Sequence, residues 1–318
     1  MKIGILGTGF GAYHTQLWQK SGLAESIIVF GRNEGKLQHL QSEYKVDVTT
    51  RIDDILQDPE VSLIDICLPT TLHREYTIQA LKHGKHVFCE TPLCLTEEDL
   101  LAMQQAEQTY GRRVFVNQFI KFDPPYTYLH NVISGQKYGK LLSLTLKRET
   151  PPLWGDLGLK LIATNLMIHE LDFISGIRGP HNPAMVWGTN AEKQGQALVR
   201  VTLQHPEGLT EVMASSQMPE KYPFMVGYEA YFEHGKLVYN ENDYGTGPAE
   251  CTLLEYTSQG RQQIHLEGAD PYEKSIEHVA HALQHGTDSC LSIAHAAVSL
   301  ETAFTIRQTL MKHENLEF

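Results

Sequence analysis

The stretch KIGILGTGFGA, residues 2–12, decides the fold that this chain is predicted to adopt. KIGIL indicates a short strand, and GTGFGA follows at G-x-G-x-x-A spacing before a helical pattern. Gly7 permits the tight turn, Gly9 lets a phosphate approach the backbone, and Ala12 is small enough for close helix packing. The helix N-terminus would direct its N–H groups at that phosphate. By itself the motif is also compatible with a glycine-rich turn that binds nothing.

The second predicted strand ends in VFGRN, where an NAD-type site usually carries an Asp or Glu for the ribose 2′-hydroxyl. Gly31 and Arg32 stand there instead. A guanidinium suits a 2′-phosphate, so we predict NADP(H) as the favoured cofactor and NAD(H) as possible. An arginine that merely faces solvent is the alternative. The predicted cofactor contacts in this part of the chain are Gly7, Thr8, Gly9, Phe10, Gly11, Ala12, Gly31, Arg32 and Asn33.

The first 121 residues alternate short β-rich runs with amphipathic helical patterns. Such alternation is typical of βαβ units and a parallel sheet, here a doubly wound Rossmann domain. Thr96 with Asp99 indicates a helix start, and Gly111 indicates the end of that helix. Further strands are predicted at SIIVF (26–30), SLIDICL (62–68), HVFCE (86–90) and VFVNQ (114–118).

Residues 122–318 follow a different rhythm, which predicts a second domain. One helix and the strand KLLSLTLKRE (140–149) precede a loop, and LIATNLMIHELDFISG (161–176) has the pattern of one continuous helix. Several alternating strands are predicted between Met185 and Glu267, and two helices close the chain. Runs of strands followed by helices indicate an α+β domain with a large, mostly antiparallel open sheet.

The composition excludes several classes of protein. A formal net charge of -12 argues against nucleic acid as a partner. No apolar run approaches the ~18 residues of a membrane span, and the first residues lack a secretory pattern. Five cysteines at unrelated spacings argue against a disulfide framework, so a cytoplasmic setting is expected.

Three histidines, His278, His281 and His285, fall on one face of a late helix. Their spacing invites a metal site, but no cysteine motif or second acidic cluster accompanies them. A partly exposed or interface helix face is the simpler interpretation, and we predict no metal.

The stretch DICLPTTLHREYTIQALKHGKHVFCETPL, residues 65–93, carries a family resemblance. It is similar to the D-x-x-x-x-x-P-x-x-x-H…A-L-x-x-G-K-H-V-x-x-E-K-P pattern of the Gfo/Idh/MocA family, named for glucose–fructose oxidoreductase, inositol dehydrogenase and rhizopine catabolism. VISGQKYGKLLSL and NLMIHELDF also resemble segments of that family's C-terminal domain. The matching residues are Asp65, Pro69, His73, Ala80, Leu81, Gly84, Lys85, His86, Val87, Glu90 and Pro92.

The resemblance implies a Rossmann domain followed by an α/β domain with an open sheet, by which subunits pair into homodimers or homotetramers. It implies further cofactor contacts. Asn117 and Gln118, at the end of the sixth predicted strand, are candidates for the nicotinamide carboxamide, because strand ends line the ligand crevice. The added predicted cofactor contacts are Leu68, Pro69, His73, Glu90, Thr91 and Asn117.

The family's chemistry is hydride transfer between a nicotinamide and a hydroxyl or carbonyl carbon, which needs a proton acceptor and a stabiliser of alkoxide charge. The family places a lysine, an aspartate and a histidine at the positions that Thr91, Asn165 and His169 occupy here. Lys121 falls where the family tends to have a basic residue. We therefore predict His169, Thr91, Asn165 and Lys121 as the catalytic set, with Trp154 as a candidate cover for a substrate ring.

The sequence thus predicts an NAD(P)-dependent oxidoreductase of a small carbonyl or polyol compound, sugar- or inositol-like. Thr91 offers a hydrogen bond but no charge, so a reductase direction is expected. Two alternatives remain open: a non-catalytic dinucleotide-binding sensor or regulator, and a biliverdin-reductase-like reductase of a conjugated substrate.

Overall fold

The computed structural model describes residues 1–153, 155–180, 182–190, 195–206 and 208–314. The chain divides into two compact units. The first unit comprises residues 1–119 and 269–297, and the second comprises residues 120–268 and 298–318.

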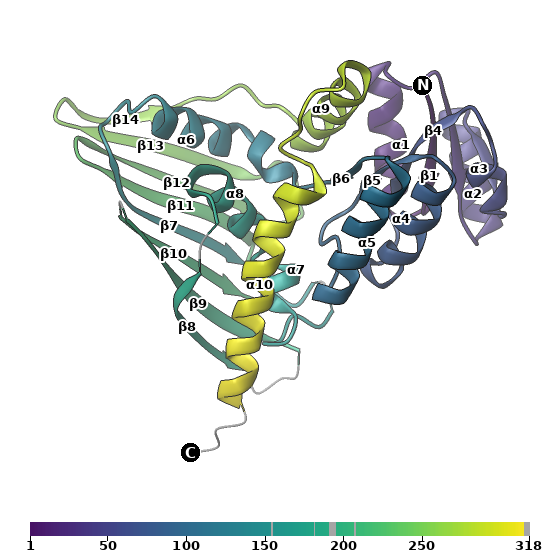
Figure 1. The fold of residues 1–318 in the computed structure, drawn as a ribbon. Helices are drawn as coiled ribbons and strands as arrows, with labels where there is room; N and C mark the ends of the chain where they lie inside the picture. Colours follow the sequence, from purple (N-terminus) through teal and green to yellow (C-terminus); the bar gives the residue numbers. More distant parts are fainter. Residues whose placement is uncertain (154, 181, 191–194, 207, 315–318) are drawn as a thin grey trace. The chain divides into compact units, whose positions relative to one another are not determined.

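The first unit is built on a six-stranded parallel sheet with the order β3-β2-β1-β4-β5-β6 (Figure 1). The chain moves outward from β1 in one direction and then restarts at β4 on its other side, which is the doubly wound arrangement predicted from the sequence. The carboxyl ends of all six strands therefore share one edge. The strands are β1 (Lys2–Leu6), β2 (Ser26–Phe30), β3 (Asp47–Thr49), β4 (Val61–Ile66), β5 (His86–Cys89) and β6 (Val114–Val116).

Local signals set the helices of this unit. The Thr96 hydroxyl accepts a hydrogen bond from the Asp99 N–H at 3.1 Å, and Gly111 ends the same helix in a left-handed conformation. Both features agree with the sequence prediction. The helices are α1 (Phe10–Ser21), α2 (Glu34–Tyr44), α3 (Asp53–Leu56), η1 (Thr70–Leu72), α4 (His73–Lys82), α5 (Glu97–Tyr110) and α9 (Pro271–His285).

Helix α9 corrects the predicted domain organisation, which assigned everything after residue 121 to one domain. α9 lies beside α1 in the first unit (Figure 1). The Tyr272 ring stacks on Phe119 at 4.0 Å between centroids, and Ser275 and Ile276 are fully buried. A helix near the end of the chain therefore completes the core of the first unit, and no local sequence pattern predicts this.

The second unit is built on an eight-stranded sheet with the order β14-β13-β12-β11-β7-β10-β9-β8. Among the described strands of this sheet, only the β7–β10 pair is parallel, so the predicted mostly antiparallel sheet is confirmed. The strands are β7 (Leu141–Glu149), β8 (Pro183–Asn190), β9 (Ala197–His205), β10 (Gly208–Ser215), β11 (Phe224–Phe232), β12 (Gly235–Asp243), β13 (Glu250–Thr257) and β14 (Gly260–Ile264).

Helices α6 (Pro124–Ser134), α8 (Ile168–Arg178) and α10 (Ile293–Glu314) cover one face of this sheet (Figure 1). Tyr126 of α6 is fully buried between Phe173 of α8 and Tyr228 of β11, with ring centroids 5.1 and 5.6 Å away. Such aromatic pairs add to the burial of apolar area in this core.

The predicted continuous helix over residues 161–176 is wrong. A short helix, α7 (Ile162–Asn165), ends before α8 begins at Ile168. The Met167 N–H donates to the Ile162 carbonyl, one residue wider than the α-helical spacing, so the turn between them is widened. Asn165 and His169 therefore lie on two separate helices, not on one helical face.

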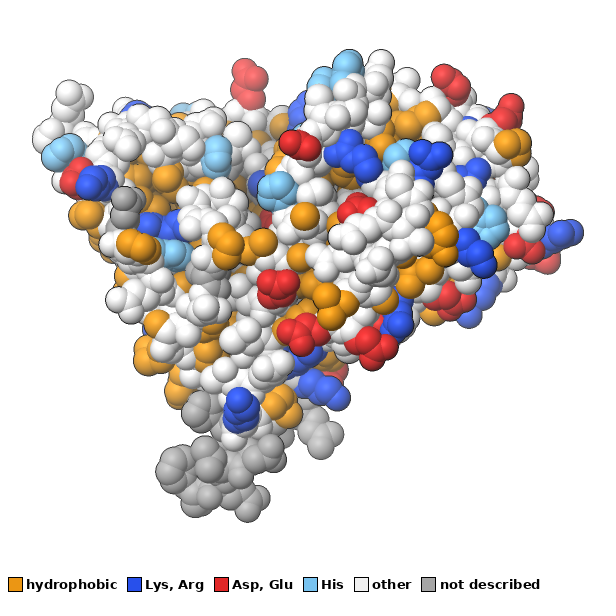
Figure 2. All heavy atoms as spheres, in the orientation of Figure 1, with side chains coloured by type: hydrophobic (Ala, Val, Ile, Leu, Met, Phe, Trp, Pro, Cys, Tyr) orange, Lys and Arg blue, Asp and Glu red, His pale blue; other side chains and the backbone are white. Residues whose placement is uncertain are grey.

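No helix among the described residues is long and apolar enough to cross a membrane. All five cysteines are free thiols. On the surface of the first unit that Figure 2 shows, lysine and arginine side chains are interspersed with acidic ones.

Candidate functional site

A pocket of about 460 Å³ lies at the carboxyl edge of the first sheet, where the ends of β1, β2 and β4 meet. Its volume falls within the usual range of small-ligand sites. It brings together eight of the residues predicted to contact a cofactor. The lining comprises Gly7, Thr8, Gly9, Phe30, Gly31, Arg32, Asn33, Lys36, Cys67, Leu68 and Pro69.

The turn between β1 and α1 fits a pyrophosphate. Gly7 has φ +121°, and a Cβ there would meet the Cys67 carbonyl oxygen at 2.5 Å, so only glycine allows this turn. Gly9, the residue before α1, has open space where its Cβ would stand, and no side chain caps the helix. The first N–H groups of α1 are therefore available to an anion.

Two cations line the end of the pocket beside β2. Arg32 was predicted from the sequence, whereas Lys36, on the first turn of α2, was missed. Its spacing of four residues from Arg32 was the available signal. Asn33 caps α2, because its side chain accepts the Lys36 N–H at 3.0 Å. None of the described lining residues is an Asp or Glu, so this end suits a phosphate better than a bare ribose hydroxyl pair.

His73 was predicted to contact the cofactor, but its ring is fully committed inside the protein. Nδ1 lies 3.1 Å from the carbonyl oxygens of both Pro92 and Leu93, and Nε2 lies 2.7 Å from the Leu68 carbonyl oxygen. Burial lowers the pKa of His73. The residue joins the loops that follow β4 and β5.

A buried charged network crosses the first unit below the pocket. His14 of α1 is 0% exposed; its Nδ1 lies 2.8 Å from Asp65 and its Nε2 lies 3.0 Å from Glu90. Trp18, one turn further along α1, donates to Asp65 at 2.7 Å. Burial is the largest single influence and opposes a charge on His14, but the charge and hydrogen bond of Asp65, together with those of Cys67, hold the pKa of His14 well above its usual value. An imidazolium thus bridges two carboxylates.

Asn117 was predicted to reach the nicotinamide, but its carboxamide belongs to the same network. Its Nδ2 donates to Glu90 at 2.5 Å, and its Oδ1 accepts from Ser275 of α9 at 2.8 Å. Asn117 and Glu90 are therefore supports of the loop after β5. The remaining predicted contacts, Phe10, Gly11 and Ala12, belong to the first turn of α1, where Gly11 packs against Ile5.

Thr91 follows Glu90, and its N–H lies 3.3 Å from the Glu90 carboxylate. The Thr91 hydroxyl is buried and has no hydrogen-bond partner among the described residues. A buried hydroxyl without a partner is costly, so its presence at a strand end is a feature to be explained.

The second unit holds the other predicted catalytic residues, His169, Asn165 and Lys121. Lys121 lies in the 3₁₀ turn η2 (Phe119–Phe122), and its Nζ is 2.9 Å from Asp172 of α8. Asn165 ends α7, and its side-chain oxygen accepts the Thr164 hydroxyl at 2.9 Å. Trp154 lies outside the described residues.

A buried ion pair is formed by Glu170, the residue that follows His169. Arg148 of β7 donates through Nε to both carboxylate oxygens of Glu170, at 2.9 and 3.0 Å, and so fixes the start of α8 on the sheet. Burial, and then the charge of Arg148, lower the pKa of His169 well below its usual value. His169 is therefore neutral at neutral pH.

Sequence reasoning also missed His14 and Trp18, whose i, i+4 spacing on the face toward the sheet was the only signal. His14, Asp65 and Cys67 form the one metal-like cluster among the described residues. The polar atoms of this cluster already bond to one another. Cys67 donates to Asp65 at 3.4 Å, and the His14 imidazole carries a proton.

The strand order, the glycine turn and the pocket define the first unit as a dinucleotide-binding Rossmann domain. Residues 1–118 match the family described as an oxidoreductase family with an NAD-binding Rossmann fold. The motif of residues 65–93 resembles the same family, Gfo/Idh/MocA.

Individual relatives are distant. Inositol 2-dehydrogenase of Pseudomonas fluorescens is 27% identical over 55% of this chain, and this chain spans about half its length, 53%. 2,7-Anhydro-N-acetylneuraminate hydratase of Mediterraneibacter gnavus is 27% identical over 70% of this chain and 64% of its own length. An oxidoreductase of Agrobacterium radiobacter, solved with NAD⁺, L-tartaric acid and magnesium, has the same fold, with a TM-score of 0.83, 15% identity, and 98% and 97% of the two chains covered.

Replacing His14 with leucine should lower the free energy of unfolding by about 3–5 kcal/mol, because two buried carboxylates lose their cation. In the unmutated protein, stability should also fall as pH rises from about 6.5 through the raised pKa of His14, since the folded state holds the proton more tightly. Urea titrations at several pH values measure both effects.

The control for this prediction is His39→Leu, which removes a 74% exposed imidazole paired with Glu43. Little change in the free energy of unfolding is expected for this variant. A His14→Leu variant as stable as the His39→Leu variant would contradict the bridge.

Proposed function

We propose that this protein is an NAD(P)-dependent oxidoreductase that transfers a hydride between the nicotinamide and a hydroxyl-bearing or carbonyl carbon of a small polyol- or sugar-like compound. The observation that carries the proposal is the pocket at the N-terminus of α1. No side chain caps this helix, and the space where a Cβ of Gly9 would stand is open. Those features fit a pyrophosphate, and the bound cofactor would supply the hydride chemistry.

Within this proposal, His169 exchanges the proton that accompanies the hydride. Its neutral imidazole accepts a proton from a substrate hydroxyl, so oxidation proceeds at neutral pH. Reduction of a carbonyl requires the imidazolium, which forms only in acid. The lowered pKa therefore weighs against the expected preference for reduction at neutral pH.

Thr91 selects the substrate rather than the direction. A lysine ammonium at this position would stabilise developing alkoxide charge, and losing one such stabiliser costs on the order of 3–4 kcal/mol. Both directions of one reaction share a transition state, so both slow by the same factor. We infer a substrate whose alkoxide is stabilised by its own neighbouring electron-withdrawing groups. The names of the relatives support polyols and acidic sugars as the class to test first.

The second candidate is a dinucleotide-binding sensor without turnover. It is favoured by Thr91 and Asn165, which replace two groups that the family's chemistry uses. A sensor would bind the cofactor but would turn over no polyol, sugar acid or ketone.

His169→Ala should lower turnover by about 10²- to 10⁴-fold and leave cofactor affinity unchanged, because the general base is lost and the pocket is intact. In the unmutated protein, oxidation should hold steady from neutral pH downward and fall only as pH drops through the lowered pKa of His169. Reduction should rise over the same interval. Nicotinamide absorbance follows both directions.

The matched control is His130→Ala, which removes an exposed histidine of α6. Equal turnover in the two variants would show that His169 takes no part in the reaction. Absence of turnover in the unmutated protein, with intact cofactor binding, would favour the sensor.

We propose NADP(H) as the preferred cofactor, since Arg32 and Lys36 both line the pocket beside β2. A charge-assisted contact to a 2′-phosphate is worth about 1–3 kcal/mol. The double variant Arg32→Ala, Lys36→Ala should lose most of the preference for NADPH and keep its affinity for NADH, as measured by calorimetry. Arg51→Ala, 76% exposed and outside the lining, is the control. Equal affinities for NADPH and NADH in the unmutated protein would contradict this choice.

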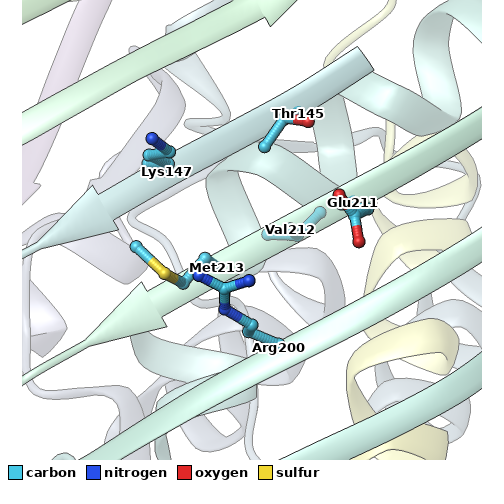
Figure 3. Close-up of a pocket in the computed structure, with 6 residues that line it drawn as sticks. All are labelled: Thr145, Lys147, Arg200, Glu211, Val212 and Met213. Carbon is cyan, nitrogen blue, oxygen red and sulfur yellow. The ribbon is translucent and has the colours of Figure 1, made fainter. Parts of the chain in front are cut away.

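We also propose that the second unit pairs with a second copy through the sheet face that its helices leave uncovered. Residues of four neighbouring strands share one cross-strand row on this face: Lys147, Met213, Arg200 and Trp187. Figure 3 shows the first three around a hollow of about 210 Å³. Met185 and Trp187 of β8 are 61% and 51% exposed. An open, partly apolar sheet of this size is a surface that proteins usually cover.

Trp187→Glu should weaken this self-association by at least tenfold, because it buries a charge in the apolar part of the face. Light scattering at micromolar concentration should give a dimer or tetramer for the unmutated protein and smaller species for the variant. Leu101→Glu, on a 64% exposed leucine of α5, is the control. A monomeric unmutated protein would refute the pairing.

The cytoplasmic setting, consistent with five free thiols, stays a prediction.

A further inference from the structure

The three histidines that share one face of α9 have different surroundings in the structure. His281 and His285 are exposed, and their rings stack on each other at 4.1 Å between centroids. His278 is half-buried and contacts the segment between α9 and α10. Its Nε2 lies 2.9 Å from the Ser289 hydroxyl and 3.7 Å from the Cys290 sulfur. One imidazole nitrogen therefore lies within hydrogen-bonding reach of a thiol.

The segment that carries this thiol is held to the first unit by its backbone (Figure 1). The Val116 N–H of β6 donates to the Leu291 carbonyl at 2.8 Å, and the Leu291 N–H donates to the Ser289 hydroxyl at 3.0 Å. Ser289 is only 3% exposed. Cys290 stands between these two anchored residues, so its sulfur is kept close to His278.

This arrangement has the parts that make a cysteine reactive. The thiolate is the nucleophile, and a histidine that accepts the thiol proton raises the thiolate fraction. The Ser289 hydroxyl oxygen lies beside the same nitrogen, so it can accept a hydrogen bond from the imidazolium that forms. Cys290 is half-buried, and the residues just before Ser289 are exposed, so a small reagent can approach the sulfur.

The other four cysteines lack this combination. Three of them are buried: Cys67, Cys89 and Cys94. Burial raises the pKa of the first two. Cys251 of β13 is exposed, but desolvation and then the charge of Glu241 raise its pKa to about 11. Among the described residues, Cys290 is thus the one accessible thiol with an imidazole beside it.

We propose that Cys290 is a modification site that forms a reversible mixed disulfide with a small disulfide such as glutathione disulfide, with His278 as the base. The thiol proton moves to Nε2, and the thiolate attacks one sulfur of the reagent. The reagent's S–S bond breaks, and the departing thiolate takes the proton from His278. One disulfide replaces another, so no further oxidant is needed, and excess thiol reverses the step. This site lies outside the cofactor pocket and does not depend on the proposed function.

The first test is the rate at which iodoacetamide alkylates each cysteine as pH is varied, resolved by peptide mass mapping. An ordinary thiol gives a midpoint near about 8.5. The midpoint for Cys290 should lie at least one pH unit below that value and below the midpoint for Cys251. Glutathione disulfide at pH 7 should modify Cys290 before Cys251, dithiothreitol should remove the adduct, and Cys290→Ser should abolish it.

His278→Gln should raise the Cys290 midpoint by about one pH unit or more. It should slow the exchange at pH 7 only a few-fold, because a more basic thiolate is also a stronger nucleophile. His281→Gln, which removes an exposed histidine of the same helix, should change neither quantity. Ser289→Ala loosens the segment but keeps the imidazole, so its Cys290 midpoint should stay below that of Cys251. This variant separates loss of the base from loss of packing.

A Cys290 midpoint no lower than that of Cys251 would overturn the proposal. So would a midpoint that His278→Gln leaves unchanged, or a glutathione adduct that forms on Cys251 but not on Cys290.

Discussion

The imidazolium of His14 between Asp65 and Glu90 is the interaction on which the candidate cofactor site depends. It joins α1, whose N-terminus faces the pocket, to the end of β4 and to the loop after β5. Asn117 and Ser275 extend the same network to β6 and α9. In a low-dielectric interior, such a network is stable only when every member is paired. The glycine turn, the strand ends and the returning helix are therefore held in one arrangement before any ligand arrives.

This arrangement separates two kinds of polar residue that the sequence could not tell apart. His73, Glu90 and Asn117 have partners inside the protein, so their part is to fix the backbone of the loops. Thr91 and Gln118 carry atoms without partners at the edge of the sheet. An unsatisfied buried atom weakens the free protein.

The elements with strong local signals could be predicted from the sequence. The G-x-G-x-x-A turn, the alternation of strands and helices, and the Thr96 and Gly111 caps depend on residues within one or two turns of chain.

The features that were missed depend on distant residues. α9 packs with a domain that ended 150 residues earlier in the chain. The widened turn before α8 and the pairing of His14 with Asp65 and Glu90 likewise follow from tertiary packing. Pattern reasoning therefore predicted eight of the residues that line the pocket, but it could not show that His73 bonds to backbone carbonyls or that Asn117 bonds to Glu90 and to a residue of α9.

The central claim is that the first unit binds NADP(H) along the carboxyl edge of its sheet. A crystal structure of the protein with NADPH tests it most directly. The account predicts the pyrophosphate against the Gly9–Phe10 backbone, the 2′-phosphate between Arg32 and Lys36, and the nicotinamide beside Thr91. A dinucleotide bound elsewhere, or one whose 2′-phosphate contacts neither cation, would contradict it.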